Sequence, residues 1–391
     1  MANTNLANAK NAKNDEFYTQ YPDIQKEINA YLDYDPDVFR GKTVLLPCDD
    51  PEWSNFTKFF AQNFELLGLK KLISTSYAPE SKKYKVPYQP TLFETSQPYY
   101  SADKAKTHGK IFVLDKDVTG DNRINIDDLQ WQYLESDGDF RSKEIRALRD
   151  EADIIVTNPP FSLFREFVAW LMESGKKFVI IGTMNAISYK EIFPLLMNNK
   201  MWLGNGFQNG NAYFRVANER EYADGVYDAE TGLVKFRNCC WFTNIDHGRR
   251  HQPLKLMTMA ENFKHSKHKE IRGRKDYIHY DNCNALEIPF TDSIPSDYDG
   301  VMGVPISFLD KYCPEQFEIV GITKTWYGFA DKIYPEQIQV SKDGKQSKVS
   351  KLNDGATIKL IEIPEGETYY IVNGELFSQV YARVLIRKKQ S

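Results

Sequence analysis

Residues 158–161 carry the side chains whose types and spacing are best suited to chemistry: Asn158, Pro159, Pro160 and Phe161. They follow the β-branched run 153–157, which predicts a buried strand that ends at the rigid double proline. Open α/β sheets bind their ligands at the carboxyl ends of such strands. The asparagine offers a side-chain carbonyl, and the prolines offer backbone carbonyls without N–H groups. Acceptors beside an aromatic ring suit a planar amine, such as a nucleobase or an amide that is methylated on nitrogen. The alternative is a proline-rich strand-to-helix turn without a catalytic role.

Alternating strands and helices surround this turn. Apolar runs predict strands at 43–46, 69–76, 111–114, 153–157 and 177–182, and helical spacing predicts helices at 53–67, 162–174 and 189–198. Such alternation is typical of a doubly wound α/β sheet with right-handed crossovers. Prolines interrupt the polar segment 78–110, which predicts an insertion extending to about residue 135. Beyond residue 200 the periodicity fades, and we expect strands only at 239–244 and 379–386.

The composition limits the class of protein. The chain has 391 residues, 41% of them hydrophobic and 27% charged, which predicts one or two well-packed domains. A net charge of −4 provides no global attraction to polyanions, so any nucleic-acid contact requires a local basic surface. No apolar run approaches the roughly 20 residues that span a bilayer. Five irregularly spaced cysteines do not form a disulfide framework. We therefore expect a cytoplasmic protein without a membrane partner.

Six short motifs, taken in order, are similar to those of a known family: residues 15–20 (DEFYTQ), 48–51 (CDDP), 54–56 (SNF), 138–142 (GDFRS), 158–165 (NPPFSLFR) and 300–305 (GVMGVP). On these motifs the chain resembles the EcoRI-type adenine-specific DNA methyltransferases over roughly residues 14–320. The resemblance implies a Rossmann-like, S-adenosylmethionine-dependent methyltransferase sheet followed by a C-terminal target-recognition region. It also implies double-stranded DNA as substrate, a monomer, and a possible cognate restriction endonuclease. The double-proline motif alone is shared with RNA and protein-glutamine methyltransferases, which remain alternatives, as does a catalytically silent DNA-binding protein.

The resemblance implies which residues bind the cofactor: Phe17, Tyr18, Thr19, Cys48, Asp49, Asp50, Asn55, Asp139 and Phe140. The loop after the first strand lacks the glycines of most such loops. Carboxylates nevertheless suit a ligand that carries an ammonium group, a sulfonium and ribose hydroxyls. Each group also has a purely structural alternative. Asp49 and Asp50 precede a helix and suit a cap, residues 136–139 have turn composition, and residues 17–19 suit packing of an N-terminal arm.

The expected chemistry follows from the turn. Hydrogen bonds from the adenine amine to the Asn158 side chain and the Pro159 carbonyl would offset the positive charge that develops on the nitrogen. The target base must leave the duplex to reach this pocket, and Phe161 would then stack on it.

A cluster of basic side chains predicts the DNA contact: Lys264, Lys267, Lys269, Arg272, Arg274 and Lys275. The alternative is a solvated helix face. We therefore expect a disordered lead at 1–14, a catalytic domain at 15–245 and a DNA target-recognition and C-terminal region at 246–391.

Two patterns raise the question of a metal, although we expect none. Residues 117–128 place oxygen-bearing side chains at calcium-loop positions, but Asn122 replaces the turn glycine and Asp128 is shorter than the usual glutamate. Zinc binding by Cys239, Cys240 and nearby histidines is disfavoured because adjacent residues of a strand point to opposite faces.

Overall fold

The structure is a computed structural model that describes residues 17–49, 54–81, 92–95, 99–207, 211–216 and 225–389. The chain divides into two compact units, neither of them continuous in sequence. Unit 1 comprises residues 1–184 and 201–248, and unit 2 comprises residues 185–200 and 249–391. The expected lead at 1–14 lies outside the described residues.

An eight-stranded mixed sheet forms the centre of unit 1, in the order β5-β4-β3-β2-β6-β7-β12-β8. Its middle is parallel: β3 (Lys71–Thr75), β2 (Thr43–Leu46), β6 (Ile154–Thr157) and β7 (Lys177–Thr183). Its flanks are antiparallel: β4 (Lys110–Leu114) and β5 (Gln130–Tyr133) on one side, β12 (Cys239–Thr243) and β8 (Trp202–Leu203) on the other. The β2 and β6 segments are buried throughout, as expected for apolar runs covered on both faces.

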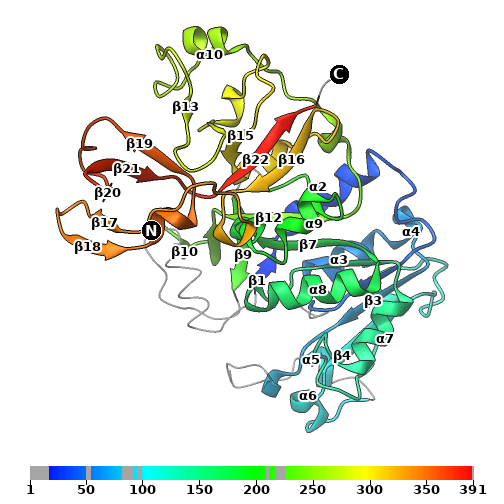
Figure 1. Cartoon of the computed structure of the whole chain (residues 1–391). Coiled ribbons are helices and arrows are strands. Elements are labelled where there is room, and N and C mark those ends of the chain that lie inside the picture. The colour runs from blue at the N-terminus through cyan, green and yellow to red at the C-terminus, as the bar shows by residue number, and fades with distance from the viewer. Residues whose placement is uncertain are drawn as a thin grey trace. The chain divides into compact units, whose positions relative to one another are not determined.

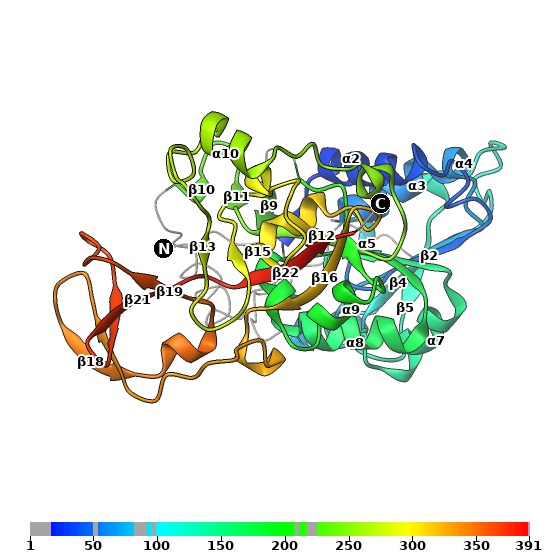
Figure 2. The same cartoon turned by 45° about the horizontal axis from the view of Figure 1, so that its top comes forward.

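Helices cover both faces of this sheet, which makes unit 1 a layered α/β structure (Figures 1 and 2). One face carries α2 (Tyr21–Leu32), α3 (Asn55–Gln62) and α4 (Phe64–Leu67); the other carries α7 (Lys143–Glu151) and α8 (Phe164–Ser174). Two shorter helices, α5 (Leu92–Thr95) and α6 (Lys104–Thr107), precede β4. Local sequence sets the helix ends. Ser54 caps the first amides of α3 and Ser142 those of α7, while Gly68 and Gly175 end α4 and α8 in the left-handed conformation.

A small antiparallel sheet in unit 1 joins the beginning of the chain to its middle. Its order is β1 (Phe17–Thr19), β9 (Ala212–Val216), β11 (Leu233–Phe236) and β10 (Tyr227–Asp228). Side chains alternate between its two faces, as in any strand. Phe214 and Phe236 belong to the buried face, whereas Tyr213 and Arg215 are exposed on the other.

Unit 2 is rich in short strands. One sheet contains β13 (Ile278–His279), β14 (Leu286–Glu287), β15 (Met302–Pro305), β22 (Arg383–Lys388) and β16 (Phe317–Ile322), in that order. The second has the order β18 (Gln346–Val349), β17 (Gln337–Val340), β20 (Tyr369–Val372), β21 (Glu375–Gln379) and β19 (Thr357–Leu360). Helices α9 (Phe193–Met197) and α10 (Met259–His265) belong to this unit.

Three predicted elements have different bounds in the structure. The helix expected at 53–67 is divided at Asn63 into α3 and α4. The helix expected at 189–198 is reduced to α9, because Pro194 has no N–H and is accommodated only in a first helical turn. The strand expected at 379–386 was also wrong: β21 ends at Gln379 and β22 begins at Arg383, since alternation alone does not reveal where one strand stops and another starts.

No helix in the described ranges has the length and apolar character needed to cross a bilayer.

Candidate active site

The Asn-Pro-Pro-Phe turn lies at the carboxyl end of β6, near the middle of the main sheet. Asn158 is half-buried and Pro159 is buried. Phe161 begins a single 3-10 turn, Phe161–Leu163, that leads into α8. Because β2 and β6 are parallel neighbours, the loop after β2 opens at the same sheet edge as the turn. The two motifs, about 110 residues apart in sequence, therefore meet at one edge.

Asp49 links these two motifs directly. Asp49 is 6% exposed, and its carboxylate accepts hydrogen bonds from the Ser54 hydroxyl at 2.8 Å and the Thr157 hydroxyl at 2.6 Å. Its backbone carbonyl accepts a third bond from the Ser74 hydroxyl at 2.8 Å. Ser54 caps α3 and Thr157 directly precedes Asn158. One buried side chain thus holds together the loop after β2, the start of α3 and the turn predicted to be catalytic. Asp50 lies outside the described residues.

Cys48 and Asp139 are also neighbours at this edge. Burial raises the pKa of the Cys48 thiol, and the negative charges of Asp49 and Asp139 act in the same direction. Partial burial acts to raise the pKa of Asp139, but hydrogen bonds from the Arg141 guanidinium, at 2.9 and 2.6 Å, hold that pKa below its ordinary value. Arg141 also contacts Glu166 at 3.1 Å. Asp139 is therefore an ionised carboxylate close to the end of β2.

Phe140, predicted beside Asp139 as a cofactor contact, lies among other aromatic rings. It is 5% exposed and packs edge-to-face on Phe167 and Trp170 of α8, with centroid distances of 5.1 and 5.8 Å. The preceding Gly138 has φ +81°, and a Cβ at that position would lie 2.2 Å from the Ser76 carbonyl oxygen. This close approach holds the 138–140 turn against the end of β3 and requires glycine there.

β1 brings the predicted N-terminal cofactor segment to α3. The Asn55 amide donates to the Thr19 carbonyl at 2.8 Å, so two of the predicted residues are in contact. Thr19 is 2% exposed, and its hydroxyl has no hydrogen-bond partner among the described residues. Tyr18 is half-buried, and the side chain of Phe17 lies outside the description. A buried hydroxyl without a partner is a group that a bound ligand can satisfy.

The aromatic ring of the turn contacts the small sheet. Phe161 is half-buried and lies edge-on to Phe214 at 6.5 Å and to Phe236 at 6.4 Å, from β9 and β11. These two contacts were missing from our sequence-based site. Residues 212–216 and 233–236 are too short for their alternation to identify them as strands from the sequence.

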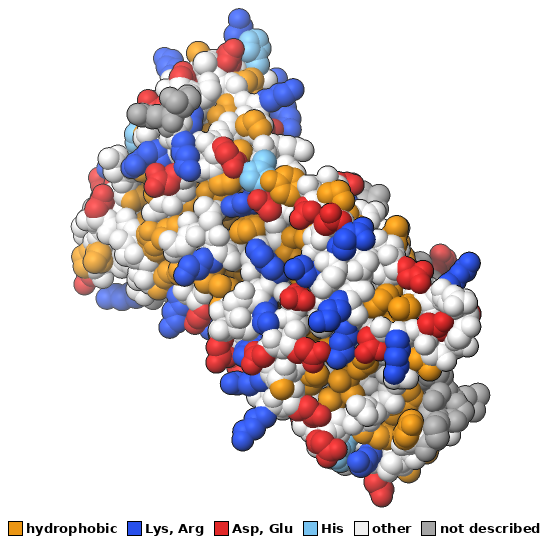
Figure 3. All heavy atoms as spheres, turned by 90° about the vertical axis from the view of Figure 1, so that its right-hand side faces the viewer, with side chains coloured by type: hydrophobic (Ala, Val, Ile, Leu, Met, Phe, Trp, Pro, Cys, Tyr) orange, Lys and Arg blue, Asp and Glu red, His pale blue; other side chains and the backbone are white. Residues whose placement is uncertain are grey.

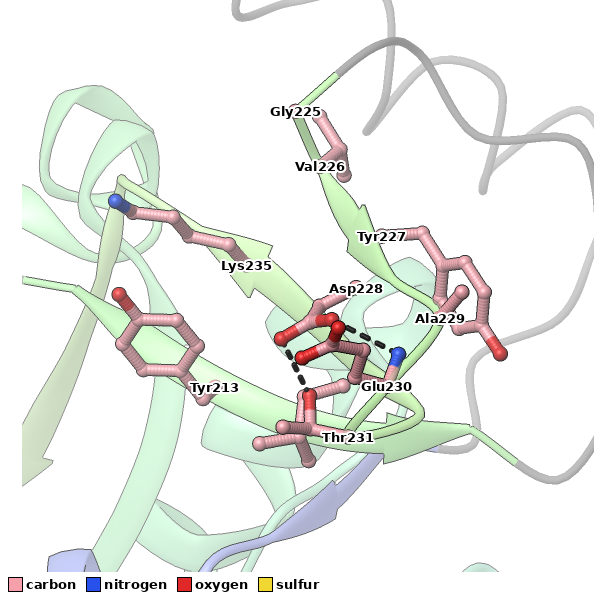
Figure 4. Close-up of a pocket in the computed structure, with 10 residues that line it drawn as sticks. Tyr213, Gly225, Val226, Tyr227, Asp228, Ala229, Glu230, Thr231 and Lys235 are labelled. Atoms are coloured by element: carbon pink, nitrogen blue, oxygen red, sulfur yellow. Dashed lines mark hydrogen bonds between the residues drawn. The ribbon is translucent and has the colours of Figure 1, made fainter.

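A hollow of about 710 Å³ lies on the opposite face of the small sheet, away from the turn. Figure 4 shows Tyr213 and Lys235 on one side of it and the hairpin residues Asp228 and Thr231 at its base. The Lys235 ammonium lies 5.7 Å from the centroid of the Tyr213 ring, and Asp228 accepts a hydrogen bond from the Thr231 hydroxyl at 2.8 Å. The sequence did not predict this hollow.

The predicted DNA-binding cluster begins in α10 of unit 2. All six of its side chains are exposed: Lys264, Lys267, Lys269, Arg272, Arg274 and Lys275. Lys267 pairs with Asp292 at 2.8 Å, and the same carboxylate binds His268. The other five have no ion pair with any described residue. Figure 3 shows that Lys, Arg, Asp and Glu side chains are otherwise interspersed over one face of the molecule.

The calcium-like segment is held by its own backbone. The Asp128 carboxylate accepts hydrogen bonds from the amides of Val118, Thr119 and Asn125 at 2.8 to 3.0 Å. These bonds lower the pKa of Asp128 to about 2. Asp117 likewise accepts from the amides of residues 120 and 122. The carboxylates of Asp117 and Asp128 therefore bind amides of their own loop, 117–128. Within the described ranges, no group of three or more His, Cys, Asp or Glu side chains is arranged to hold a metal ion. Cys239 and Cys240 form no disulfide with a described residue.

Comparison with known proteins identifies the family of the chain. A family model described as "Adenine-specific methyltransferase EcoRI" matches residues 5–389. The chain is 40% identical over 322 residues to the Type II methyltransferase M.EcoRI of Escherichia coli, covering 82% of this chain and 89% of that one. It is 32% identical to the Type II methyltransferase M.MpnI of Mycoplasma pneumoniae, over 83% of this chain and 88% of that one. For the Type II methyltransferase M.MgeORF184P of Mycoplasma genitalium the identity is 30%, over 98% of each chain. No solved structure matches the chain significantly.

A mixed α/β unit with an Asn-Pro-Pro-Phe turn at its sheet edge is the framework of an amino-methyltransferase. The chain belongs to the EcoRI family of adenine-specific methyltransferases.

Proposed function

We propose that this protein transfers a methyl group from S-adenosylmethionine to the exocyclic amine of adenine at a specific site in double-stranded DNA. Adenine-specific methylation follows from membership of the family, which extends over nearly the whole chain. The observation that carries the rest is the Asp49 carboxylate, which joins the predicted cofactor loop to the predicted catalytic turn. The parallel middle of the main sheet supports a Rossmann-like methyltransferase arrangement, with the site at the carboxyl ends of β2 and β6.

The residues at this edge fit the cofactor. We assign its binding to the predicted set, of which Thr19, Asn55, Cys48, Asp49 and Asp139 lie at the ends of β1, β2 and the adjoining loops. The Thr19 hydroxyl, which has no partner in the described part of the chain, is a preformed hydrogen-bonding group for it. The carboxylates of Asp49 and Asp139 suit its cationic and hydroxyl groups. The cofactor supplies an activated methyl group on sulfur, so the protein has only to position and polarise the acceptor.

The turn does that positioning. The Asn158 side-chain carbonyl and the Pro159 backbone carbonyl accept hydrogen bonds from the two N–H groups of the adenine amine and stabilise the charge that develops on nitrogen. The base reaches them by rotating out of the duplex. Phe161, held edge-on by Phe214 and Phe236, stacks on the extruded ring.

Unit 2 provides the target recognition in this proposal. Lys264, Lys269, Arg272, Arg274 and Lys275 contact phosphates, whereas Lys267 is already paired with Asp292. The enzyme acts as a cytoplasmic monomer, with a restriction endonuclease of the same site as its cognate partner. Of the two regions expected from sequence, residues 15–245 carry the catalytic role and residues 246–391 the recognition role.

The test is Asn158→Ala. Loss of a preorganised polar contact costs about 10²–10³ in rate, so the variant should lose nearly all methylation of duplex DNA while melting and binding S-adenosylmethionine like the wild type. Asn29→Ala is the matched control, because Asn29 is an exposed asparagine on α2. N6-methyladenine is measured by mass spectrometry of the product. A variant that retains more than half of the wild-type turnover removes Asn158 from the mechanism. Methylation of RNA or of a protein glutamine in place of DNA overturns the proposal as a whole.

A further inference from the structure

The β17–β18 hairpin of unit 2 concentrates positive charge in a protein whose net charge is −4. Residues 341–351 contain four lysines, Lys342, Lys345, Lys348 and Lys351, and a single acidic residue, Asp343. The strands pair in regular antiparallel register, from Gln337 opposite Val349 to Val340 opposite Gln346. Gly344 closes the turn with φ +79°. Three of the lysines therefore sit on a regular two-stranded ribbon, and Lys351 follows it directly.

All four lysines are exposed, and none forms an ion pair with any residue that the structure describes. Other lysines of this unit are neutralised: Lys324 pairs with Asp354 and Lys359 with Glu375. Asp343 instead accepts a hydrogen bond from the Ser341 hydroxyl within the turn. The positive charge of the hairpin is consequently not neutralised by any described residue.

Protection of a sheet edge does not explain this charge. β18 is the edge strand of its sheet (Figures 1 and 2), and a charged side chain on such a strand prevents pairing with another molecule. Only Lys348 lies within β18; Lys342 and Lys345 are in the turn, and Lys351 follows the strand. Three of the four charges are thus placed where they do not shield the edge.

We propose that the β17–β18 hairpin is a second DNA-contacting element, whose lysines bind the phosphates of the duplex beside the methylated site. The inference rests on the proposed function. A two-stranded ribbon, with strands about 4.8 Å apart, fits the major groove, which is about 12 Å wide. Lysines on its turn and flanks are then placed to reach the phosphates that border the groove. The hairpin lies apart from α10 in both views of unit 2 (Figures 1 and 2), so it enlarges the basic footprint rather than duplicating it.

The experiment compares the salt dependence of duplex binding by full-length proteins. In the test variant, Lys342, Lys345, Lys348 and Lys351 are all replaced by Gln. In the control, Gln replaces four equally exposed lysines of unit 1 that have no ion pair with described residues: Lys70, Lys104, Lys106 and Lys116. Each lost phosphate contact lowers the slope of log affinity against log salt by roughly 0.9. We expect the test variant to lose about 2–4 units of slope, and the control to keep the wild-type value.

A third variant with Arg at the four hairpin positions should restore the slope, which separates lost charge from lost folding. The inference is overturned by a slope that equals the wild-type value in a test variant that melts normally. Aggregation with an unchanged slope would assign the lysines to edge protection instead. Methylation of adenine by the wild-type protein is measured first, so failure of the proposed function is distinguishable from failure of the hairpin's role.

Discussion

At the scale of single residues, the sequence left two alternatives for Asp49. Its position before α3 predicted either a helix cap or a cofactor contact. In the structure, the cap of α3 is Ser54, and Asp49 accepts a hydrogen bond from the hydroxyl of that capping residue. Its second oxygen accepts from Thr157, the residue before Asn158. A buried carboxylate held in this way fixes the position of the predicted cofactor loop relative to the predicted catalytic side chain.

Thr157→Val tests this link. The substitution keeps the shape of a fully buried side chain but removes the 2.6 Å hydrogen bond to Asp49. We expect a stability loss of about 1–3 kcal/mol and a fall in kcat of about 10- to 100-fold, since small displacements of a catalytic group are costly. Thr157→Ser should recover much of kcat. In the control, Thr243→Val, the lost bonds run to the Phe178 carbonyl and from the Ile245 amide. Phe178 is near the start of β7, at the end of the sheet opposite to the turn. A kcat equal to that of the control would refute the coupling.

Phe161→Ala separates base stacking from packing. Base–aromatic stacking contributes about 1–3 kcal/mol, so catalytic efficiency should fall by about one to two orders of magnitude. Because Phe161 is half-buried, its loss should lower the melting temperature less than Phe214→Ala, which empties a fully buried position at a cost of about 3–5 kcal/mol. Melting curves and single-turnover rates measure the two effects. Equal destabilisation by both variants, with normal turnover per folded molecule for Phe161→Ala, would place the ring in the core alone.

At the scale of elements, the sequence predicted best those strands and helices whose residue pattern is compatible with a single type of structure. Continuous apolar runs at 43–46, 153–157 and 177–182 became the central strands, because burial on both faces requires such runs. The small sheet and most of unit 2 were missed, since their strands of two to six residues are too short for periodicity to identify. The same limit applies to the site. The turn and the loop after β2 were predicted, but Phe214 and Phe236 come from the unpredicted strands.

The hydrogen bonds that close segment 117–128 should depend on pH. Hydrogen bonds from the amides of Thr119 and Val118 lower the pKa of Asp128 from 3.8 to about 2. A lowered pKa means that the stabilisation is complete above pH 4 and is lost as the pH falls toward 2. Asp128→Asn should therefore speed hydrogen exchange at these amides near pH 6. The difference in exchange rate between the variant and the wild type should shrink below pH 4. Added calcium should leave both proteins unchanged. Calcium-dependent protection of the wild-type amides would contradict the self-closed loop.

At the scale of the whole molecule, both units are assembled from separated stretches of chain. Residues 185–200 belong to unit 2, although they lie between β7 and β8 of unit 1. Within unit 2, Phe193 of α9 packs against Trp326 and Tyr327 at 6.2 and 6.0 Å. A cut near residue 246 therefore falls at a boundary in sequence but leaves α9 without its partners.

A fragment of residues 1–248 should accordingly expose apolar surface. We expect it to bind an apolar dye and aggregate, because the aromatic partners of Phe193 are missing. Replacement of residues 185–200 by a Gly/Ser linker of matched length should reduce dye binding. Dye binding is measured by fluorescence and aggregation by light scattering, for both fragments. Equal dye binding and aggregation of the two fragments would show that α9 does not need its unit 2 partners.

The pairing of β1 with β9 determines when the predicted cofactor site can assemble. Phe17 lies opposite Val216, about 200 residues later in the chain. At synthesis rates of about 5–20 residues per second, the first of these strands leaves the ribosome some 10–40 s before its partner. During that interval Thr19 has no β9 to pair with, although α3 and the early strands of the main sheet have already been made. The strand that carries Thr19 thus gains its pairing partner late in biosynthesis, and a nascent chain stalled before residue 212 would lack that pairing.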